Sequence, residues 1–242
     1  VCWKIILALL IFSSCSKDLK SNNAVVVTRH HLATEIGAEV LKNGGNAIDS
    51  AVAVAFALAV VNPSAGNLGG GGFMLYYDAD DEKTFALDYR ERAPQNATEK
   101  MFLNKEGDVI KGLSLNSYLA SGVTGTVKGM FKAHNLFGSI PIENLIAPAI
   151  KIAKDGFKLS NFQATNFNKY KKKFLNGSDS ELIFIKEGGF KEGDIFIQAD
   201  LAKSLELIQS RGQKVFYEGK LADQIVEDFA QNGGLISSED LL

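Results

Sequence analysis

The stretch from Asn46 to Val61 constrains the fold of this chain more than any other, because it has almost no polar side chain after Ser50. A helix that is apolar on all sides has to be buried on most of them, so this segment is expected between layers of structure. Asn46 is a suitable N-cap, and the Asp49 carboxylate can complement the free N–H groups of the first turn. Asn62-Pro63 then ends the helix.

Two further elements are predicted before this helix. The β-branched run from Ala24 to Thr28 lacks polar alternation and is typical of a buried strand. A helix is expected from Thr34 to Asn43, ended by Gly44-Gly45.

A glycine-rich loop follows the apolar helix, from Ser64 to Gly72, and it ends in four consecutive glycines. A phosphate-binding loop is not favoured, because the Gly-Lys-Ser/Thr ending is missing and these glycines precede a strand, the reverse of the order in dinucleotide-binding folds. We interpret the glycines as permitting positive φ and a close backbone approach where two layers touch. A narrow passage beside an active site is compatible with that interpretation.

An antiparallel hairpin is predicted next, with strands at Phe73–Tyr77 and Thr84–Tyr89 around a polar turn. The period of two along a strand places Arg90 on the same face as Asp88 and Arg92. Charged residues at a strand end, just after a buried glycine loop, form a candidate binding rim.

The rest of the chain is dominated by helical patterns, with short strands expected between Ser180 and Ile197. Four lysines between Lys169 and Lys173 are interpreted as a solvated face, because the net charge of −2 and the pI of about 6.0 favour neither nucleic acid nor an anionic membrane surface. With three histidines and two cysteines, few ligands are available for a transition metal. The predicted helices are Val127–Phe137, Ile142–Asp155, Asn161–Phe174, Ala199–Gln209 and Tyr217–Gln231.

The N-terminus has the pattern of a bacterial lipoprotein signal over residues 1–15. Ile5 to Phe12 is apolar but shorter than the ~20 residues that a membrane span needs. Cys15 follows two small residues and is the candidate lipidation site, while an ordinary signal peptide with an incidental cysteine is the alternative. Residues 16–23 are polar and are expected to form a tether. Because Cys2 is the only other cysteine, no disulfide is expected in the folded part, residues 24–242.

The C-terminal residues Ser237 to Leu242 have the pattern of an N-cap, an acidic first turn and the first apolar pair of a helix. A single turn cannot overcome helix nucleation. This pattern therefore predicts that the chain is a truncated part of a longer protein.

Taken together, the chain resembles the N-terminal part of the large subunit of the γ-glutamyltranspeptidases. Seven stretches carry the resemblance, and their order and spacing hold from about Val25 to Leu242. They are Val26 to Thr28 with His31 to Thr34, Leu41 to Asp49, Asn62-Pro63 with Gly66 to Met74, Asp88 to Glu91 with Ala93-Pro94, Gly122 to Gly129, Ala147 to Ile150, and Gly233 to Leu235.

The resemblance implies an α+β fold of the N-terminal nucleophile hydrolase type, an α-β-β-α sandwich that is incomplete in this chain. It implies γ-glutamyl transfer from, or hydrolysis of, glutathione and related γ-glutamyl amides, through an acyl-enzyme on the N-terminal threonine of a small subunit cut from the same precursor. No metal or organic cofactor is implied. By its place in Asp88-Tyr89-Arg90-Glu91, Arg90 is implied to bind the substrate's α-carboxylate, while Arg92 is expected to be a supporting or surface charge.

The nucleophile of the family lies beyond the matched region, so no catalytic residue is expected in this chain, which should be inert by itself. Two alternatives stay open: a lipid-anchored relic or binding module without catalysis, and an amidohydrolase like the cephalosporin acylases. The expected location is the bacterial cell envelope, periplasmic or surface-exposed. The expected membrane contact is the lipid anchor only, with no nucleic-acid partner. Hydrolysis and transfer both remain open.

Overall fold

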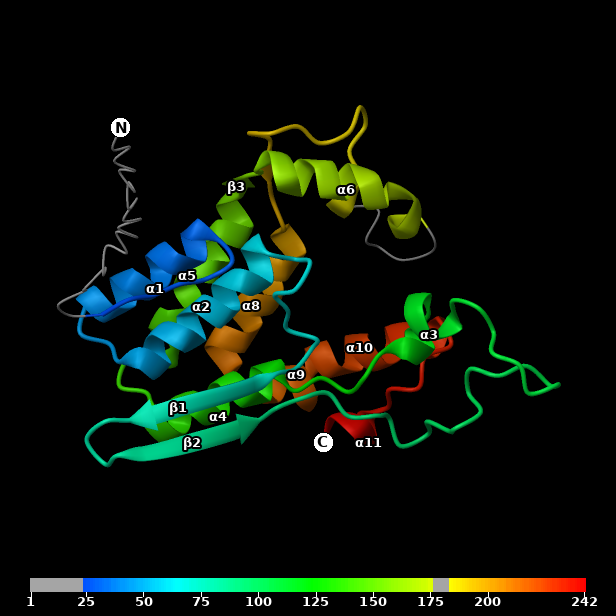
Figure 1. The fold of residues 1–242 in the computed structure, drawn as a ribbon, viewed down its shortest axis with the longest axis horizontal. Coiled ribbons are helices and arrows are strands. Elements are labelled where there is room, and N and C mark those ends of the chain that lie inside the picture. Colours follow the sequence, from blue (N-terminus) through cyan, green and yellow to red (C-terminus); the bar gives the residue numbers. More distant parts are fainter. Residues whose placement is uncertain (1–23, 176–182) are drawn as a thin grey trace, which may run out of the picture.

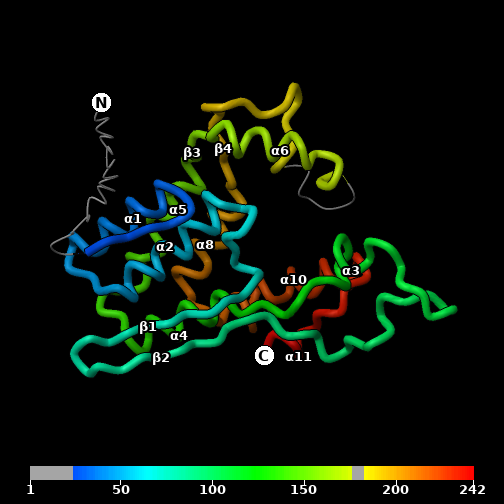
Figure 2. Tube along the Cα trace, viewed as in Figure 1, coloured from blue at the N-terminus to red at the C-terminus, as the bar shows by residue number. Residues whose placement is uncertain are grey.

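A computed structural model describes residues 24–175 and 183–242 (Figures 1 and 2). The predicted signal segment 1–15, with Cys15, and the predicted tether 16–23 lie outside the described residues. Across the described ranges, no helix combines the length and the apolar character that crossing a bilayer requires.

The described chain consists mainly of helices, with two short antiparallel ribbons (Figure 1). The helices are α1 (His31–Lys42), α2 (Ala47–Val61), α3 (Leu113–Asn116), the 3-10 turn η1 (Tyr118–Ala120), α4 (Thr126–Phe137), α5 (Ile142–Asp155), α6 (Asn161–Phe174), α8 (Ala199–Arg211), α9 (Lys214–Tyr217), α10 (Lys220–Gln231) and α11 (Ser238–Leu241). The strands are β1 (Phe73–Asp78), β2 (Lys83–Asp88), β3 (Phe157–Lys158) and β4 (Ile195–Phe196).

Helix α2 is the centre of the packing, as its apolar sequence predicts. It packs against α1, α4 and α5, and α8 covers the other side of α5 (Figure 1). Val52, Ala53, Phe56 and Val60 are almost completely buried. The predicted cap is confirmed: the Asn46 side chain accepts hydrogen bonds from the N–H groups of Ile48 and Asp49.

The hairpin of β1 and β2 lies along α4, with Phe73 opposite Asp88 in the antiparallel register. On its inner face, Tyr76 and Phe85 pack their rings on Phe137 of α4, with centroid distances of 4.9 and 4.7 Å. The outer face of the hairpin is not covered by any described residue and carries exposed apolar side chains. Predicted and observed strands agree to within one residue at each end.

A second packing centre joins α6 to the rest of the molecule. Phe167 of α6 contacts the rings of Phe184, Phe190 and Phe196 at centroid distances of 5.1 to 5.6 Å. Strand β4 pairs with β3, so this phenylalanine cluster connects α6 to the end of α5. Helix α6 therefore lies at the outer edge of the bundle, with one side held by aromatic packing (Figure 1).

Three predicted elements differ from the structure. The run from Ala24 to Thr28 is not a buried strand: Val25 and Val27 are 66% and 86% exposed, and no β-ladder with another described segment forms at Val25 to Thr28. A strand needs a ladder partner, which β-branched composition alone does not supply. Between residues 183 and 197, only β4 is a strand. The helix predicted from Tyr217 to Gln231 begins only at Lys220, as α10, because Gly219 is extended; Tyr217 instead ends the short helix α9.

Candidate substrate-binding site

A cleft of about 540 Å³ opens where β2 ends, and Arg90 lines it. The end of β2 forms one wall, and the turn from Val123 to Gly125 with the start of α4 forms another. Tyr217 of α9 and Asp240 of α11 complete the lining. The predicted binding rim therefore borders a real concavity, built from segments that are far apart in the sequence.

The backbone on both sides of Arg90 is fixed by hydrogen bonds. Tyr89 and Gly72 pair in both directions, with N···O distances of 3.0 and 3.3 Å. Arg92 and Val123 form an antiparallel bridge, with N···O distances of 2.7 and 3.3 Å. Arg90 thus lies between two anchored neighbours, which limits how far its Cα can move.

Glycines make this close assembly possible. A Cβ on Gly71 would lie 2.5 Å from the Tyr89 carbonyl oxygen, and a Cβ on Gly125 would lie 2.1 Å from the same atom. A Cβ on Gly129 would lie 2.4 Å from Cγ of the Tyr89 ring. The predicted close approach is confirmed, but the predicted positive φ is wrong for this loop: none of the glycines from Gly69 to Gly72 has one.

A polar network joins the glycine loop to the start of α4. Thr124 Oγ1 lies within hydrogen-bond distance of two carbonyl oxygens, those of Leu68 (2.9 Å) and Gly70 (3.1 Å). Its single hydroxyl proton can be donated to either of them. Asn67 Oδ1 accepts from the Gly70 N–H (2.8 Å) and from Thr126 Oγ1 (2.7 Å). Sequence reasoning missed Asn67 and this role of the two threonines, because the only signal was a polar residue inside a glycine run.

Arg90 has a fixed backbone and an unpaired charge. The backbone N–H of Arg90 donates to Asp88 Oδ1 at 2.9 Å. The guanidinium carbon Cζ lies 6.0 Å from the ring centroid of Phe73. No carboxylate among the described residues forms an ion pair with its guanidinium. Such a group can bind a planar anion through two parallel hydrogen bonds. The Arg92 side chain is exposed on the same rim.

Asp240, another polar group of the cleft, is engaged in structural hydrogen bonds. Asp240 accepts hydrogen bonds from the N–H groups of Gln95 and Ser237, at 2.7 and 2.9 Å. Burial raises the pKa of Asp240, but these hydrogen bonds outweigh it, so its pKa lies below the usual value. Burial raises the pKa of Tyr89. Within the described residues, no group of three or more histidine, cysteine or acidic side chains could hold a metal ion.

Known proteins resemble this chain over most of its length. Residues 33–242 match the γ-glutamyltranspeptidase family. The glutathione hydrolase proenzyme of Escherichia coli K12 is 45% identical over 225 residues, which are 92% of this chain and 39% of that protein. The chain thus spans about two fifths of the length of such curated relatives.

Solved structures support the predicted fold class. Helicobacter pylori γ-glutamyltranspeptidase is 47% identical and superposes with a TM-score of 0.89, over 92% of this chain and 64% of that one. A cephalosporin acylase from Bacillus halodurans, 24% identical with a TM-score of 0.75 over 92% of this chain and 45% of its own, shares the fold. The mixed α+β content and these neighbours confirm the N-terminal nucleophile hydrolase type. The chain belongs to the γ-glutamyltranspeptidase family.

Proposed function

We propose that the complete protein transfers or hydrolyses the γ-glutamyl group of glutathione and related amides, and that Arg90 binds the α-carboxylate of that group. The observation that carries the proposal is the unpaired guanidinium of Arg90, presented at a cleft by a backbone that is anchored on both sides. In the γ-glutamyltranspeptidase family, the arginine of the motif matched by Asp88-Tyr89-Arg90-Glu91 is expected to lie where the substrate carboxylate enters. A planar guanidinium matches two carboxylate oxygens better than an ammonium group does.

The chemistry itself needs a residue outside this chain. Thr124 and Thr126 are committed to structural hydrogen bonds, and neither corresponds to the family's nucleophile. The proposed nucleophile is the N-terminal threonine of a small subunit, released when the precursor cleaves itself. Its α-amine is the general base, and the acyl-enzyme is then resolved by water or by an amino acid. No metal or organic cofactor enters this scheme.

The proposal extends to location. Cleavage before Cys15 and acylation of that cysteine would attach the protein to a membrane of the bacterial envelope. Glutathione and similar γ-glutamyl amides outside the cytoplasm would then be its substrates. Metabolic labelling with a fatty acid, compared between the natural protein and a Cys15→Ser variant, tests this part independently of catalysis.

The test of the site is steady-state kinetics of the complete, matured protein with a chromogenic γ-glutamyl anilide. Losing a bidentate, charge-assisted contact should raise the KM of Arg90→Ala on the order of 100-fold. Arg90→Lys should recover only part of this loss. Arg92→Ala is the matched control and should change KM less than about threefold. An unchanged KM in Arg90→Ala removes Arg90 from the site.

The acylase alternative predicts a different result in the same assay. A cephalosporin amide whose acyl group has no carboxylate gives Arg90 no acyl carboxylate to bind, so Arg90→Ala would leave its KM unchanged. The relic alternative predicts no turnover of either substrate. Reading the coding DNA beyond the Leu242 codon further distinguishes the relic from an active enzyme, because an active protein needs a downstream threonine that can become the nucleophile.

A further inference from the structure

We propose that the outward face of α6 is a docking surface for anionic phospholipid. The helix contains Lys169, Lys171, Lys172 and Lys173 and has no acidic residue along its length. All four lysines are exposed, and none forms an ion pair within the described part of the chain. This proposal departs from the sequence-based interpretation of the four lysines as a solvated face and from the expectation of a lipid anchor as the only membrane contact, because the overall charge of −2 conceals this local concentration of positive charge.

Aromatic side chains accompany the lysines. Phe162 is 65% exposed and Tyr170 is 41% exposed. The ammonium groups of Lys169 and Lys173 lie 5.4 and 5.5 Å from the centroid of the Tyr170 ring. The helical period places Phe162, Lys169 and Lys173 on the side opposite the buried Ala164 and Phe167. Basic and aromatic residues on one exposed helical face are typical of helices that lie on a membrane surface.

The helix is held firmly in place, so the face does not have to be assembled on binding. Ser160 and Gln163 form a capping box at its N-terminus, and Gln163 Nε2 donates to the Val61 carbonyl at 2.8 Å. Asn168 accepts from the Phe190 N–H and donates to the Phe190 carbonyl, both at 2.8 Å. A preorganised face loses less conformational entropy when it binds.

Helix dipole complementation explains only part of this pattern. Lys171, Lys172 and Lys173 occupy the last turn, where cations are favoured. This effect explains neither Lys169 nor the exposed Phe162. Nucleic acid is the less favoured partner, because single strands are bound in grooves with stacking platforms, whereas α6 is a single helix at the outer edge of the bundle (Figure 1).

The position of α6 also suits a membrane-bound protein. It lies at the opposite side of the molecule from the Arg90 cleft, which is next to the end of β2 and to α11 (Figure 1). Docking on α6 would therefore leave the cleft open to solvent. If Cys15 is acylated as proposed, weak binding by α6 is enough to keep this face on the membrane, because the anchor raises the local concentration of α6 at the lipid surface. The proposal for α6 stands without that anchor.

The experiment measures vesicle co-sedimentation of the complete protein made without residues 1–15, so that neither the apolar run nor acylation contributes. Vesicles of phosphatidylglycerol and phosphatidylethanolamine are compared with vesicles of phosphatidylcholine. Each lysine near an anionic surface contributes a factor of about five. The triple variant K169Q/K172Q/K173Q should therefore bind the anionic vesicles on the order of 100-fold more weakly. Phe162→Ser should weaken binding severalfold.

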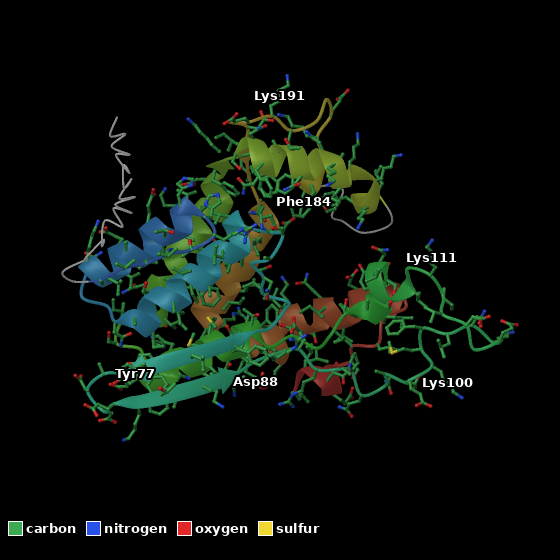
Figure 3. The ribbon with its side chains drawn as sticks, in the orientation of Figure 1. Tyr77, Asp88, Lys100, Lys111, Phe184 and Lys191 are labelled. Carbon is green, nitrogen blue, oxygen red and sulfur yellow. The ribbon has the colours of Figure 1, made fainter. Side chains whose placement is uncertain are left out.

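The matched control is K100Q/K105Q/K111Q, which removes three exposed lysines from the loop between β2 and α3, outside α6; none of them forms an ion pair with another described residue. Lys100 and Lys111 are labelled in Figure 3. It should retain at least half of the natural affinity, and added salt should weaken binding of the unmodified protein. Equal losses in both triple variants, equal binding to neutral vesicles, or no vesicle binding at all would overturn the proposal. So would binding of a single-stranded oligonucleotide by α6 in the absence of vesicle binding.

Discussion

Asp49 shows how one residue secures the central helix. It is completely buried, and its carboxylate accepts hydrogen bonds from the N–H groups of Asn46 (2.9 Å), Ser139 (2.9 Å) and Ile140 (3.3 Å), and from the Ser139 hydroxyl. It therefore joins the start of α2 to the loop after α4. Burial alone would raise the pKa of Asp49, but these hydrogen bonds, led by the Ser139 hydroxyl, outweigh it and lower the pKa below its usual value.

The Asp49→Asn substitution should lower the free energy of unfolding of the complete protein by about 3 kcal/mol at pH 7, because it weakens charge-assisted bonds and leaves buried donors poorly satisfied. Since the folded pKa lies below the unfolded value of about 3.9, the stabilisation is present above that value and is lost as the pH falls through the folded pKa. The difference between the two proteins should therefore shrink below about pH 4. Urea unfolding followed by circular dichroism measures it.

The control for this prediction is Asp223→Asn, which changes an exposed acidic residue in the first turn of α10. It should cost less than about 1 kcal/mol. A pH-independent difference between the natural protein and Asp49→Asn would show that packing, and not the charge, is what the substitution removes.

Individual site residues were predictable only where the signal was local. The two-residue period of a strand placed Arg90 beside Asp88 on an exposed face, and the structure agrees for that pair. The burial pattern does not continue to Glu91 and Arg92, which are both exposed, because β2 has already ended at Asp88. The bond between Asn67 and Thr126 joins residues 59 positions apart, so no local pattern reveals it.

At the scale of the element, the glycine loop allows the end of the hairpin to lie close to the start of α4. We expect Gly71→Ala and Gly125→Ala each to lower the free energy of unfolding by about 1–3 kcal/mol, because the new methyl group would overlap the Tyr89 carbonyl. Displacing Tyr89 also displaces Arg90, so the KM for γ-glutamyl amides should rise. Thermal unfolding and kinetics of the complete protein measure the two effects.

Gly69→Ala is the matched control, because a Cβ there meets nothing within 4 Å and its φ is not positive. It belongs to the same glycine run and should leave both stability and KM nearly unchanged. If Gly69→Ala were as damaging as Gly71→Ala, the run would be needed for backbone freedom, and the close approach to Tyr89 would not be the reason for its composition.

Elements with their own start and stop signals were predicted with the correct bounds. Helices α5 and α6 have the predicted bounds, Ile142–Asp155 and Asn161–Phe174; Pro141 and Gly156 flank α5, and Ser160 caps α6. The strand predicted from Ala24 to Thr28 does not form, because a strand depends on a ladder, and Val25 to Thr28 form none with another described segment. The predicted start of the helix at Tyr217 was three residues too early, because Gly219 is extended and precedes α10, and a single glycine inside a helical pattern is often tolerated.

At the scale of the whole molecule, the described chain leaves a large apolar surface uncovered. Phe73, Leu75 and Tyr77 alternate along the outer face of β1 and are 62%, 79% and 60% exposed. Val25 and Val27 are also exposed, in an extended segment without a ladder partner. Contiguous exposed apolar residues mark surfaces that are normally covered. Because the chain spans about two fifths of its curated relatives, we propose that the remaining length covers this face.

This proposal predicts opposite effects of one substitution in two contexts. In a fragment of residues 24–242, Leu75→Thr should improve solubility and reduce binding of a hydrophobic dye, because the side chain is exposed and its removal destroys no packing. In the complete protein, the same change should lower the free energy of unfolding by about 2 kcal/mol, because the side chain would then be buried. Leu115→Thr is the control in both contexts, since Leu115 is 81% exposed but lies in α3, away from the hairpin. If Leu75→Thr left the complete protein as stable as before, the outer face of the hairpin would remain uncovered there too, and its apolar residues would need a partner on another chain.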